Sequence, residues 1–206
     1  MVNSVILNYG LGNPKSVQNI LRKVGQKSIV SSKKEDIESC DVLIIPGVGH
    51  FAKAMELMNE SGLSELIIKH AELGKPVIGI CLGMQLLCSS SEEGDAKGLG
   101  LFDAEVLKFK KTNADFKIPN IGWLNVKLTD QSLIENFPDD PRFYFTHSYY
   151  VNCKEKADIL MESSYGIEYT VGIRKNNIYG FQFHPEKSHA FGIQLFTNLY
   201  AQLNAS

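Results

Sequence analysis

Short, continuous apolar runs, each ending at a glycine or a turn, restrict the fold of this chain more than any other feature. The runs are SVILN at 4–8, VLIIPG at 42–47 and PVIGIC at 76–81. A strand with one face in water alternates apolar and polar residues, whereas an unbroken apolar strand is covered on both faces, as in a parallel sheet. We therefore expect these runs to be buried strands of a parallel sheet.

Helical patterns lie between these runs. The spacing i, i+3, i+4, i+7 of a helix with one apolar face is met by Val17, Ile20, Leu21 and Val24. Gly25 follows as a residue that ends helices. A second helical stretch is expected from Phe51 to Leu73, interrupted near Ser61 and Gly62, and the polar segment 31–39 is either a solvated loop or a helix start. The alternation of strand and helix up to about residue 90 indicates an open α/β sheet.

The second half of the chain is richer in strand signals. β-branched and aromatic residues are frequent in AEVLKF, NVKLT, RFYFTHSYYV, DILMES and EYTVGIRKNNIYGFQF. Asn176-Asn177 lies where a hairpin turn is expected, and Ser188 is a suitable N-cap for a final helix. The expected fold is α/β, with an open, mostly parallel central sheet flanked by helices and a smaller antiparallel β portion in the second half. We expect one domain over 1–206.

Composition and charge exclude several classes of function. The net charge is -2 and no basic stripe is present, which argues against nucleic acid as a partner. The longest mostly apolar run, 76–88, is too short to cross a bilayer, and the N-terminal residues do not resemble a signal peptide. The four cysteines show no CxxC pair and no zinc-like spacing. A reduced, cytoplasmic protein is the simplest interpretation.

The segment GICLG at 79–83 has the pattern G-x-C-x-G, which is typical of a nucleophile elbow with sulfur in place of hydroxyl. In such an elbow a strand turns directly into a helix and holds the central residue, here Cys81, in a strained conformation. The helix N-terminus favours a thiolate, and the N–H of Leu82 points to where an oxyanion would form. A buried cysteine in an apolar strand would explain the same residues. Packing roles are expected for Cys40, Cys88 and Cys153.

A nucleophilic cysteine needs a base, and His184 is the best placed of the five histidines. It follows an apolar strand, and Glu186 comes two residues later, with Pro185 restricting the backbone between them. Glu186 can therefore hold one imidazole nitrogen while the other faces a thiol. Taken alone, His184 could equally pack at a strand end. His70 lies in a charged helical stretch and is expected to face solvent.

A glycine-rich loop, PGVG at 46–49, follows the predicted strand at 42–45. A loop of this kind at the carboxyl end of a strand can direct a backbone N–H into a site as a second oxyanion donor. A plain turn would have the same composition, so the loop corroborates the cysteine and histidine motifs without establishing a site by itself.

PGVG, GICLGMQ and FHPEKS, in this order and spacing, resemble a class I (triad) glutamine amidotransferase over nearly the whole chain. NYGLGNPKSV, KIPNIGW at 117–123 and FYFTHSYYV at 143–151 are most similar to the glutaminase subunits of imidazole glycerol phosphate synthase, from histidine biosynthesis. The resemblance implies a flavodoxin-like fold, no cofactor, L-glutamine as substrate, and ammonia transfer to a separate (βα)-barrel cyclase in a heterodimer.

The resemblance also implies a role for each matched residue. Cys81 would attack the glutamine side-chain amide, His184 would protonate the leaving ammonia and then activate water, and Glu186 would orient His184. The oxyanion hole would be formed by Leu82, Val48 and Gly49. Glutamine would be held by Gly47, Gln85, Ser148 and Tyr149. The partner interface and ammonia exit would include Asn13, Trp123, Tyr144 and Lys187, although ordinary core packing would also explain the aromatic residues among them.

One segment departs from the pattern of the histidine-pathway subunits, which usually read P-H-[IM]-G-W-N. Here the run is PNIGWLNV, so Asn120 replaces the histidine and Leu124 displaces the asparagine by one position. We expect this segment to contact the partner, which leaves a second function open: a paralogous subunit that supplies ammonia for amidation of a surface-polysaccharide sugar. Two further alternatives are less favoured. A non-catalytic scaffold subunit would not need Cys81, His184 and Glu186, which are all present. A γ-glutamyl thiol hydrolase is less favoured because Gln85 and the THSYY stretch resemble a site for free glutamine.

Overall fold

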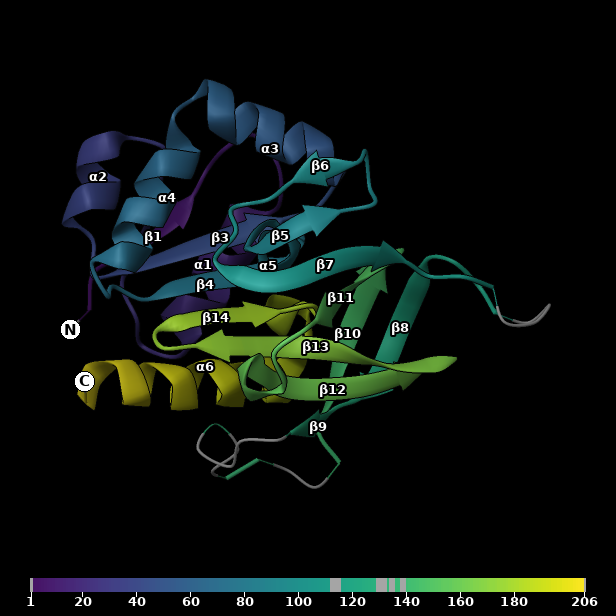
Figure 1. Ribbon diagram of the computed structural model, residues 1–206. Coiled ribbons are helices and arrows are strands. Elements are labelled where there is room, and N and C mark those ends of the chain that lie inside the picture. The colour runs from purple at the N-terminus through teal and green to yellow at the C-terminus, as the bar shows by residue number, and fades with distance from the viewer. Residues whose placement is uncertain (1, 112–115, 129–132, 134–135, 138–139, 206) are drawn as a thin grey trace.

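Five parallel strands form one half of the main sheet in the computed structural model, which describes residues 2–111, 116–128, 133, 136–137 and 140–205 (Figure 1). In spatial order they are β2 (Ser28–Ser31), β1 (Ser4–Leu7), β3 (Val42–Gly47), β4 (Val77–Cys81) and β14 (Ile178–Phe181). The three apolar runs of the sequence are β1, β3 and β4, so the predicted parallel sheet is confirmed.

Both faces of these strands are covered by helices, which explains why the runs are apolar without alternation. Val5 and Leu7 of β1 belong to the core shared with α2 (Lys34–Ser39), α3 (Phe51–Glu60) and α4 (Leu63–Glu72). Ile6, between them, belongs to the core shared with α1 (Pro14–Lys23) and α6 (His189–Ala205). Figure 1 shows α2, α3 and α4 on one side of the sheet and α6 on the other.

The second half of the chain extends this sheet with mainly antiparallel strands, as predicted. They are β5 (Cys88–Ser91), β6 (Ala96–Lys97), β7 (Phe102–Lys108), β9 (Lys127–Leu128), β11 (Tyr149–Cys153), β12 (Ile159–Tyr165) and β13 (Ile167–Lys175). The predicted hairpin joins β13 to β14, and Asn176 there has φ 53°. A separate antiparallel pair consists of β8 (Asn120–Asn125) and β10 (Arg142–His147). Short helical segments are α5 (Leu82–Leu86), η2 (Lys156–Asp158) and η3 (Pro185–Lys187).

The segment RFYFTHSYYV at 142–151 was expected to be one strand-like segment, but the structure divides it at Ser148 between two sheets. β10 pairs with β8, whereas β11, which begins at Tyr149, pairs with β7 and β13. The change of direction places the backbone between the two strands beside the carboxyl end of β4. The division therefore helps to build the site described below.

The interrupted helical stretch at 51–73 is confirmed as α3 and α4, with Gly62 between them at φ 72°. Glycine adopts this left-handed conformation without a Cβ penalty. The polar segment at 31–39 includes a short helix, α2, and Gly25 follows the end of α1 at φ 75°. The end of α1 and the break between α3 and α4 therefore use glycine, as the sequence predicted.

The expectation that His70 faces solvent is wrong. Its side chain is buried on the same face of α4 as Leu63 and Ile67, a spacing of seven and three residues that follows the helical period. Burial, followed by the nearby charge of Lys75, lowers the pKa of His70, so the imidazole is held neutral. His70 was misassigned because its neighbours in the sequence are charged, although its own position falls on the apolar face of α4.

The expectation that the Ser188 hydroxyl caps the final helix is also wrong. Ser188 does precede α6, but its hydroxyl accepts from the N–H of Tyr144 at 3.0 Å and donates to the carbonyl of His184 at 2.7 Å. It therefore ties β10 to the segment that follows β14, which carries His184 and Glu186.

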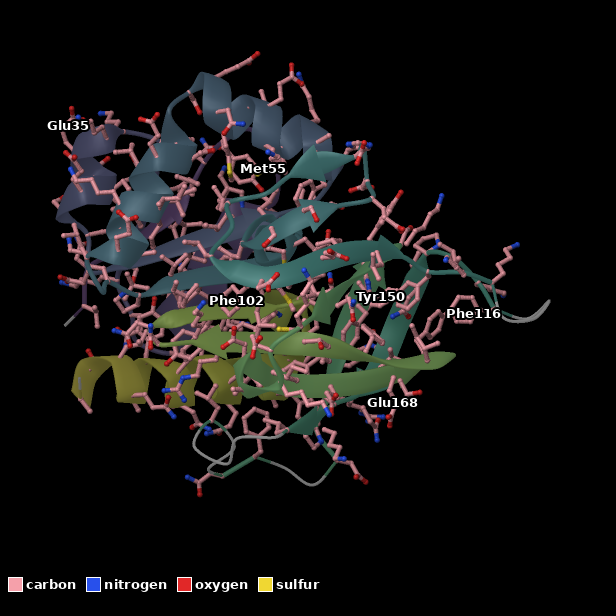
Figure 2. All side chains as sticks on the ribbon, viewed as in Figure 1. Glu35, Met55, Phe102, Phe116, Tyr150 and Glu168 are labelled. Atoms are coloured by element: carbon pink, nitrogen blue, oxygen red, sulfur yellow. The ribbon has the colours of Figure 1, made fainter. Side chains whose placement is uncertain are left out.

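An aromatic cluster fills the region where β7, β11 and β13 come together, and Figure 2 labels Phe116 and Tyr150 within it. Phe109 lies at its centre, with ring centroids 4.8 Å from Tyr150 and 5.4 Å from His147. Aromatic pairs at such separations contribute about 0.5–1.5 kcal/mol each beyond the area that they bury. Within the described residues, no helix is both long and apolar enough to cross a membrane.

Candidate active site

Cys81 lies at the junction of β4 and α5, with φ 56° and ψ -111° and only 5% of its surface exposed. A non-glycine residue with positive φ is strained, and such strain persists only where surrounding contacts impose it. The predicted strand-to-helix turn with a strained central cysteine is therefore present. Its helix is short, because α5 ends at Leu86 and β5 begins at Cys88.

The two glycines of the pentapeptide are explained by close backbone packing. A Cβ on Gly79 would lie 2.6 Å from the carbonyl oxygen of Gly83, and a Cβ on Gly83 would lie 1.9 Å from the carbonyl oxygen of Ile45 on β3. Neither neighbour is the flexible end of a side chain. The turn that presents Cys81 therefore requires glycine at both positions.

His184 and Glu186 form a buried pair beside this turn. His184 Nδ1 lies 2.7 Å from Glu186 Oε1, and the two side chains are 2% and 4% exposed. His184 follows β14, the strand next to β4, and η3 begins at Pro185, so the local backbone sets their spacing. With Nδ1 held by a carboxylate, Nε2 is the nitrogen left for other chemistry.

Cys81 and His184 interact electrostatically, although no hydrogen bond joins Sγ to Nε2. Among the described residues Nε2 is buried without a hydrogen-bond partner. Burial by itself would lower the pKa of His184, but the interactions with Cys81 and Glu186 outweigh it and raise that pKa above its ordinary value. Negative groups thus favour the imidazolium. The arrangement can pair a thiolate with an imidazolium, the combination used for nucleophilic attack and proton donation.

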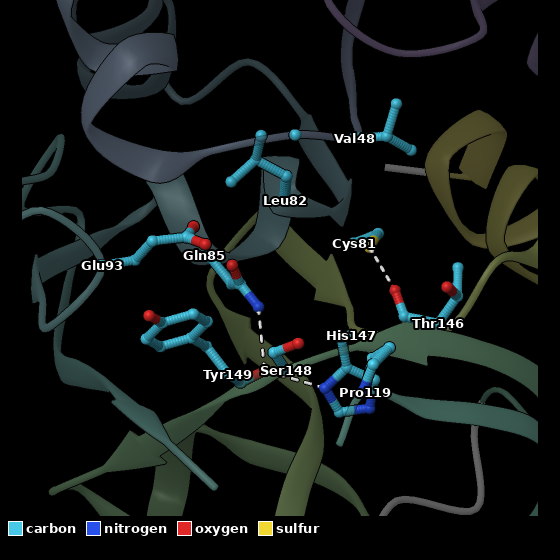
Figure 3. A pocket seen from close by; sticks show the side chains of 11 residues that line it. Val48, Cys81, Leu82, Gln85, Glu93, Pro119, Thr146, His147, Ser148 and Tyr149 are labelled. Carbon is cyan, nitrogen blue, oxygen red and sulfur yellow. Dashed lines mark hydrogen bonds between the residues drawn. The ribbon is translucent and has the colours of Figure 1, made fainter. Parts of the chain in front are cut away.

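The sulfur of Cys81 has two weak contacts besides the imidazole. Sγ can donate to the carbonyl of Thr146 at 3.9 Å (Figure 3). It can also accept from Gln182 Nε2 at 3.8 Å. The first contact suits a protonated thiol and the second suits a thiolate. Neither Thr146 nor Gln182 was identified from the sequence.

A cavity of about 340 Å³ opens at Cys81. Its lining is formed by Val48, Gly49, Cys81, Leu82, Gln85, Glu93, Pro119, Thr146, His147, Ser148 and Tyr149. The structure therefore brings Cys81 together with Leu82, the 48–49 loop and the predicted residues Gln85, Ser148 and Tyr149. Figure 3 shows Glu93, Gln85 and Tyr149 grouped on one side of the cavity, away from Cys81.

Gln85 presents an oxygen to this cavity, because its amide nitrogen is used inside the protein. Nε2 donates to the carbonyl of Tyr149 at 3.1 Å and to Gln182 Oε1 at 2.9 Å. An amide NH₂ has two hydrogens, so both are accounted for. In Figure 3 the Gln85 oxygen lies on the side of the Glu93 carboxylate. Two acceptors on one wall of a cavity form a suitable site for a cationic group.

Glu93 was missed by the sequence analysis because no local motif marks it. Its Oε2 accepts from the backbone N–H of Phe51 at 2.8 Å, at the start of α3. A carboxylate at a helix N-terminus is stabilised there, and this contact links residues 42 positions apart in the chain. Only the tertiary structure places Glu93 in the cavity.

The glycine-rich loop lies directly beside the cysteine. Gly47 is the register partner of Cys81 in the β3–β4 pairing, and a Cβ on Gly47 would lie 2.8 Å from the backbone nitrogen of Gly83. Gly49 has φ 123°, a conformation that favours glycine. The N–H groups of Val48, Gly49 and Leu82 are thus on segments that line the cavity next to Sγ.

Asn120 was expected to contact a partner, but it is only 1% exposed and points inward. Its Nδ2 lies 3.1 Å from Nε2 of His147, and His147 Nδ1 lies 2.8 Å from the carbonyl of Tyr149. Burial lowers the pKa of His147 to about 4, so the ring is neutral and can donate through Nδ1 and accept through Nε2. Asn120 therefore supports the cavity wall from inside the protein.

Three of the four predicted interface residues meet on one surface. Trp123 is 41% exposed and has its ring 6.1 Å from that of Tyr144, and Lys187 Nζ lies 5.7 Å from the Tyr144 ring. His189 stacks on Trp123 with an interplanar angle of 8°. Asn13 is exposed, and its side chain caps α1 by accepting from the N–H of Ser16 at 3.2 Å. Trp123 is thus a surface residue and not part of the core.

Metal chemistry has no candidate site in the part of the chain that the structure describes, since no group of three or more His, Cys, Asp or Glu side chains there could hold an ion.

The cysteines Cys40 and Cys88 are fully buried and Cys153 is partly buried, and all are free thiols. Burial raises the pKa of Cys40 to about 11 and also raises that of Cys88. Their thiols are therefore protonated packing groups at neutral pH.

Sequence and structure comparisons with known proteins support the family resemblance and the fold. The family model "Glutamine amidotransferase class-I" matches residues 5–202. A protein of Methanococcus maripaludis named imidazole glycerol phosphate synthase subunit HisH 2 is 47% identical over 96% of this chain and 98% of its own length. A protein of the same name from Pseudomonas aeruginosa is 43% identical, covering 94% of this chain and 96% of its own length. The solved PurLQS structure from Thermotoga maritima aligns with a TM-score of 0.73 at 18% identity, over 98% of this chain and 100% of that chain, which supports the fold alone.

Proposed function

The chain belongs to the class I glutamine amidotransferase family, and from this we propose that it is the glutaminase subunit of an imidazole glycerol phosphate synthase. In this proposal it hydrolyses L-glutamine to glutamate and ammonia, and a separate (βα)-barrel cyclase receives the ammonia. The observation that carries the proposal is the buried His184–Glu186 pair next to a strained Cys81 that lines a cavity. The relatives named above support the choice of pathway.

The first half of the reaction uses Cys81 as nucleophile. Its thiolate attacks the side-chain amide carbon of glutamine, and the carbonyl oxygen becomes an oxyanion. Backbone N–H groups of Leu82 and of the 48–49 loop are the proposed donors to this oxyanion. The imidazolium of His184 then gives its proton to the departing nitrogen, so that ammonia leaves and a γ-glutamyl thioester with Cys81 remains.

The second half of the reaction regenerates the thiolate. The now neutral His184 accepts a proton from water through Nε2, and the water oxygen attacks the thioester carbon. Collapse of the second oxyanion releases glutamate and returns the negative charge to sulfur. Glu186 holds Nδ1 through both steps and stabilises the imidazolium, which is the role that the carboxylate has in a Ser-His-Asp triad.

The cavity suggests how glutamine is oriented. The Gln85 oxygen and the Glu93 carboxylate would receive the α-ammonium group, because both present acceptors and Glu93 carries a negative charge. The segment around Ser148 and Tyr149 would hold the α-carboxylate through its backbone. In this orientation the side-chain amide would lie toward Cys81, which is on the opposite side of the cavity (Figure 3).

The covalent intermediate gives a direct test of the proposal. Acid quenching of the protein during turnover of glutamine should trap a glutamyl group on the peptide that contains Cys81. The same digest provides a control, because the buried and protonated Cys40 should carry none. A digest in which the Cys81 peptide never gains this mass, while glutamate is being released, would contradict the mechanism.

Glu186→Gln should lower kcat for glutamate release by about 10²- to 10⁴-fold, as loss of the carboxylate does in a comparable triad. The pKa of His184 is raised above its ordinary value, so its protonated form persists above the pH at which a free imidazole loses its proton. Without the charge of Glu186 the imidazolium is lost at lower pH. The alkaline limb of the pH–rate profile should therefore move to lower pH.

The matched control for this variant is Glu168→Gln, which removes an exposed carboxylate on β13 (Figure 2). This control should keep the wild-type rate and profile. If Glu186→Gln leaves the alkaline limb where it is, the proposed pairing of Glu186 with the imidazolium is wrong.

The surface formed by Trp123, Tyr144 and Lys187 is the proposed docking site for the cyclase. Ile121 on the same strand, β8, is 62% exposed and adds apolar area. Trp123→Ala should weaken binding of the cyclase by about 2 kcal/mol, the usual size for a central aromatic residue of an interface. Ile29→Ala is the control, since Ile29 is similarly exposed on the edge strand β2. Equal affinities of the two variants in a titration with cyclase would place the interface elsewhere.

A second candidate function has the same glutaminase chemistry but a different ammonia acceptor. The departures from the usual histidine-pathway motif fall on β8, the strand that carries Ile121 and Trp123. Leu124 alternates with these exposed residues and is paired with the buried Phe143. This exposed strand would be the place where a subunit serving a surface-polysaccharide pathway is adapted to a different cyclase-like partner.

A further inference from the structure

Gln182 is a fully buried polar residue immediately after β14, and both ends of its amide are used. Oε1 accepts from Gln85 Nε2 at 2.9 Å, and Nε2 lies 3.8 Å from Cys81 Sγ. The backbone N–H of Gln182 donates to the carbonyl of Val171 at 2.8 Å, so the main chain is fixed as well. One side chain therefore contacts the cysteine and a residue of the cavity wall.

The orientation of the Gln182 amide follows from its neighbours. Gln85 Nε2 is a donor to the carbonyl of Tyr149, so the atom of Gln182 that faces it must be the acceptor Oε1. Gln182 Nε2 is then directed to Cys81. A reversed amide would set two NH₂ groups against each other and leave sulfur facing an oxygen.

The two contacts of Cys81 respond in opposite ways to its protonation. The carbonyl of Thr146 can accept from a thiol but repels a thiolate, whereas the amide hydrogen of Gln182 is best matched by a thiolate. Hydrogen bonds to an ionised group are stronger than those to a neutral group. Gln182 thus favours the nucleophilic form of sulfur without adding a charge that would compete with His184.

We propose that Gln182 is a positioning residue that stabilises the Cys81 thiolate and, through the same amide, orients Gln85 toward the substrate. Gln182 keeps the Gln85 nitrogen turned inward, and this leaves the Gln85 oxygen for a cation in the cavity. The nucleophile and the proposed ammonium site are thereby coupled through one neutral side chain. The substrate part of this proposal rests on the proposed function, whereas the sulfur part does not.

Alkylation of Cys81 tests the sulfur part without any glutaminase activity. The folded protein is treated with iodoacetamide over a range of pH, and modification of the Cys81 peptide is followed by mass spectrometry. Gln182→Met removes the donor and the acceptor. Gln182→Glu keeps an oxygen that can accept from Gln85 but places an ionisable carboxyl against sulfur. The control is Gln18→Met, because Gln18 donates to the carbonyl of Ser28 on β2 and lines no part of the cavity.

Both Gln182 variants should move the rise of alkylation to higher pH, by about one pH unit, which is about tenfold slower labelling at a fixed neutral pH. Methionine cannot donate to a thiolate, and a glutamate resists ionisation of a neighbouring thiol. Gln18→Met should retain the wild-type curve. A wild-type curve in folded Gln182→Met would overturn the sulfur part. If thermal melting shows that Gln182→Met is unfolded, a wild-type curve in Gln182→Glu, which also lacks the donor, would overturn it.

The KM for glutamine tests the substrate part in the same variants. Gln182→Met should raise KM about tenfold or more, because Gln85 loses the acceptor that orients it. Gln182→Glu should keep KM close to the wild-type value, since its oxygen still accepts from Gln85. Equal KM values in Gln182→Met and wild type would overturn the coupling. A protein without glutaminase activity would contradict the proposed function, while the alkylation curves would still decide the role of Gln182.

Discussion

Cys81→Ala should abolish glutamate release, with kcat reduced at least about 10⁴-fold, because no other group can form the thioester. Water attacking the amide directly would have only the oxyanion donors and the binding site to assist it. The fold should persist, since the sulfur makes only weak contacts at 3.8 and 3.9 Å. Far-ultraviolet circular dichroism and a thermal melt would verify folding, and a coupled assay for glutamate would measure turnover.

Cys88→Ala is the matched control for this substitution. Cys88 is fully buried at the start of β5 and its thiol contacts the carbonyl of Met84 at 3.7 Å, but it does not line the cavity. We expect its loss to reduce stability modestly and to leave turnover in place. Glutamine hydrolysis by Cys81→Ala at a rate close to that of Cys88→Ala would remove the basis for a cysteine nucleophile.

Gly83→Ala should destabilise the protein by about 3 kcal/mol and also remove activity. The added Cβ would lie 1.9 Å from the carbonyl oxygen of Ile45, so either α5 or β3 must move. Movement of α5 displaces the N–H of Leu82, and movement of β3 displaces the loop that begins at Gly47. Urea denaturation measures the first effect, and glutamate release measures the second.

Gly74→Ala separates steric contact from backbone conformation. Gly74 has φ 74° with nothing within 4 Å of an added Cβ, so the substitution costs only the left-handed conformation, about 1 kcal/mol. It lies at the end of α4, away from the cavity. If Gly83→Ala is no more destabilising than Gly74→Ala, the close approach of α5 to β3 does not have the energetic role assigned to it.

The central sheet could be predicted because its signal is local. β1, β3 and β4 are each covered on both faces, and this burial appears in the sequence as an unbroken apolar run. The split between β10 and β11 could not be predicted in this way. The residues on both sides of Ser148 have the same aromatic, β-branched character, and only pairing with distant strands decides which sheet each segment joins.

The cysteine turn and the His184–Glu186 pair could also be anticipated, since each is encoded within a few residues. The glycines at 79 and 83 are needed for contacts with neighbouring backbone, and Pro185 restricts the spacing of the pair. Short motifs of this kind carry their geometry with them. Their mutual placement then follows from the adjacency of β4 and β14 in the sheet.

The supporting residues of the site were missed because their roles depend on tertiary contacts. Glu93 reaches the cavity through a bond to Phe51, and Gln182 gains its role from neighbours about one hundred positions away in the chain, Gln85 and Cys81. Asn120 was noticed as a departure from the family pattern, but its burial and its bond to His147 reversed the expected location. A single sequence does not show which polar side chains form hydrogen bonds inside the folded protein.

The most direct test of the central claim is to measure glutamate release from glutamine in three mixtures. They contain the protein alone, the protein with the histidine-pathway cyclase of the same organism, and that pair with the nucleotide substrate of the cyclase. The account predicts glutamate release that depends on Cys81 and is strongest in the third mixture. Release stimulated only by a different cyclase-like protein would assign the subunit to another pathway. No glutamate in any mixture, from folded protein with a reactive Cys81, would contradict the glutaminase function itself.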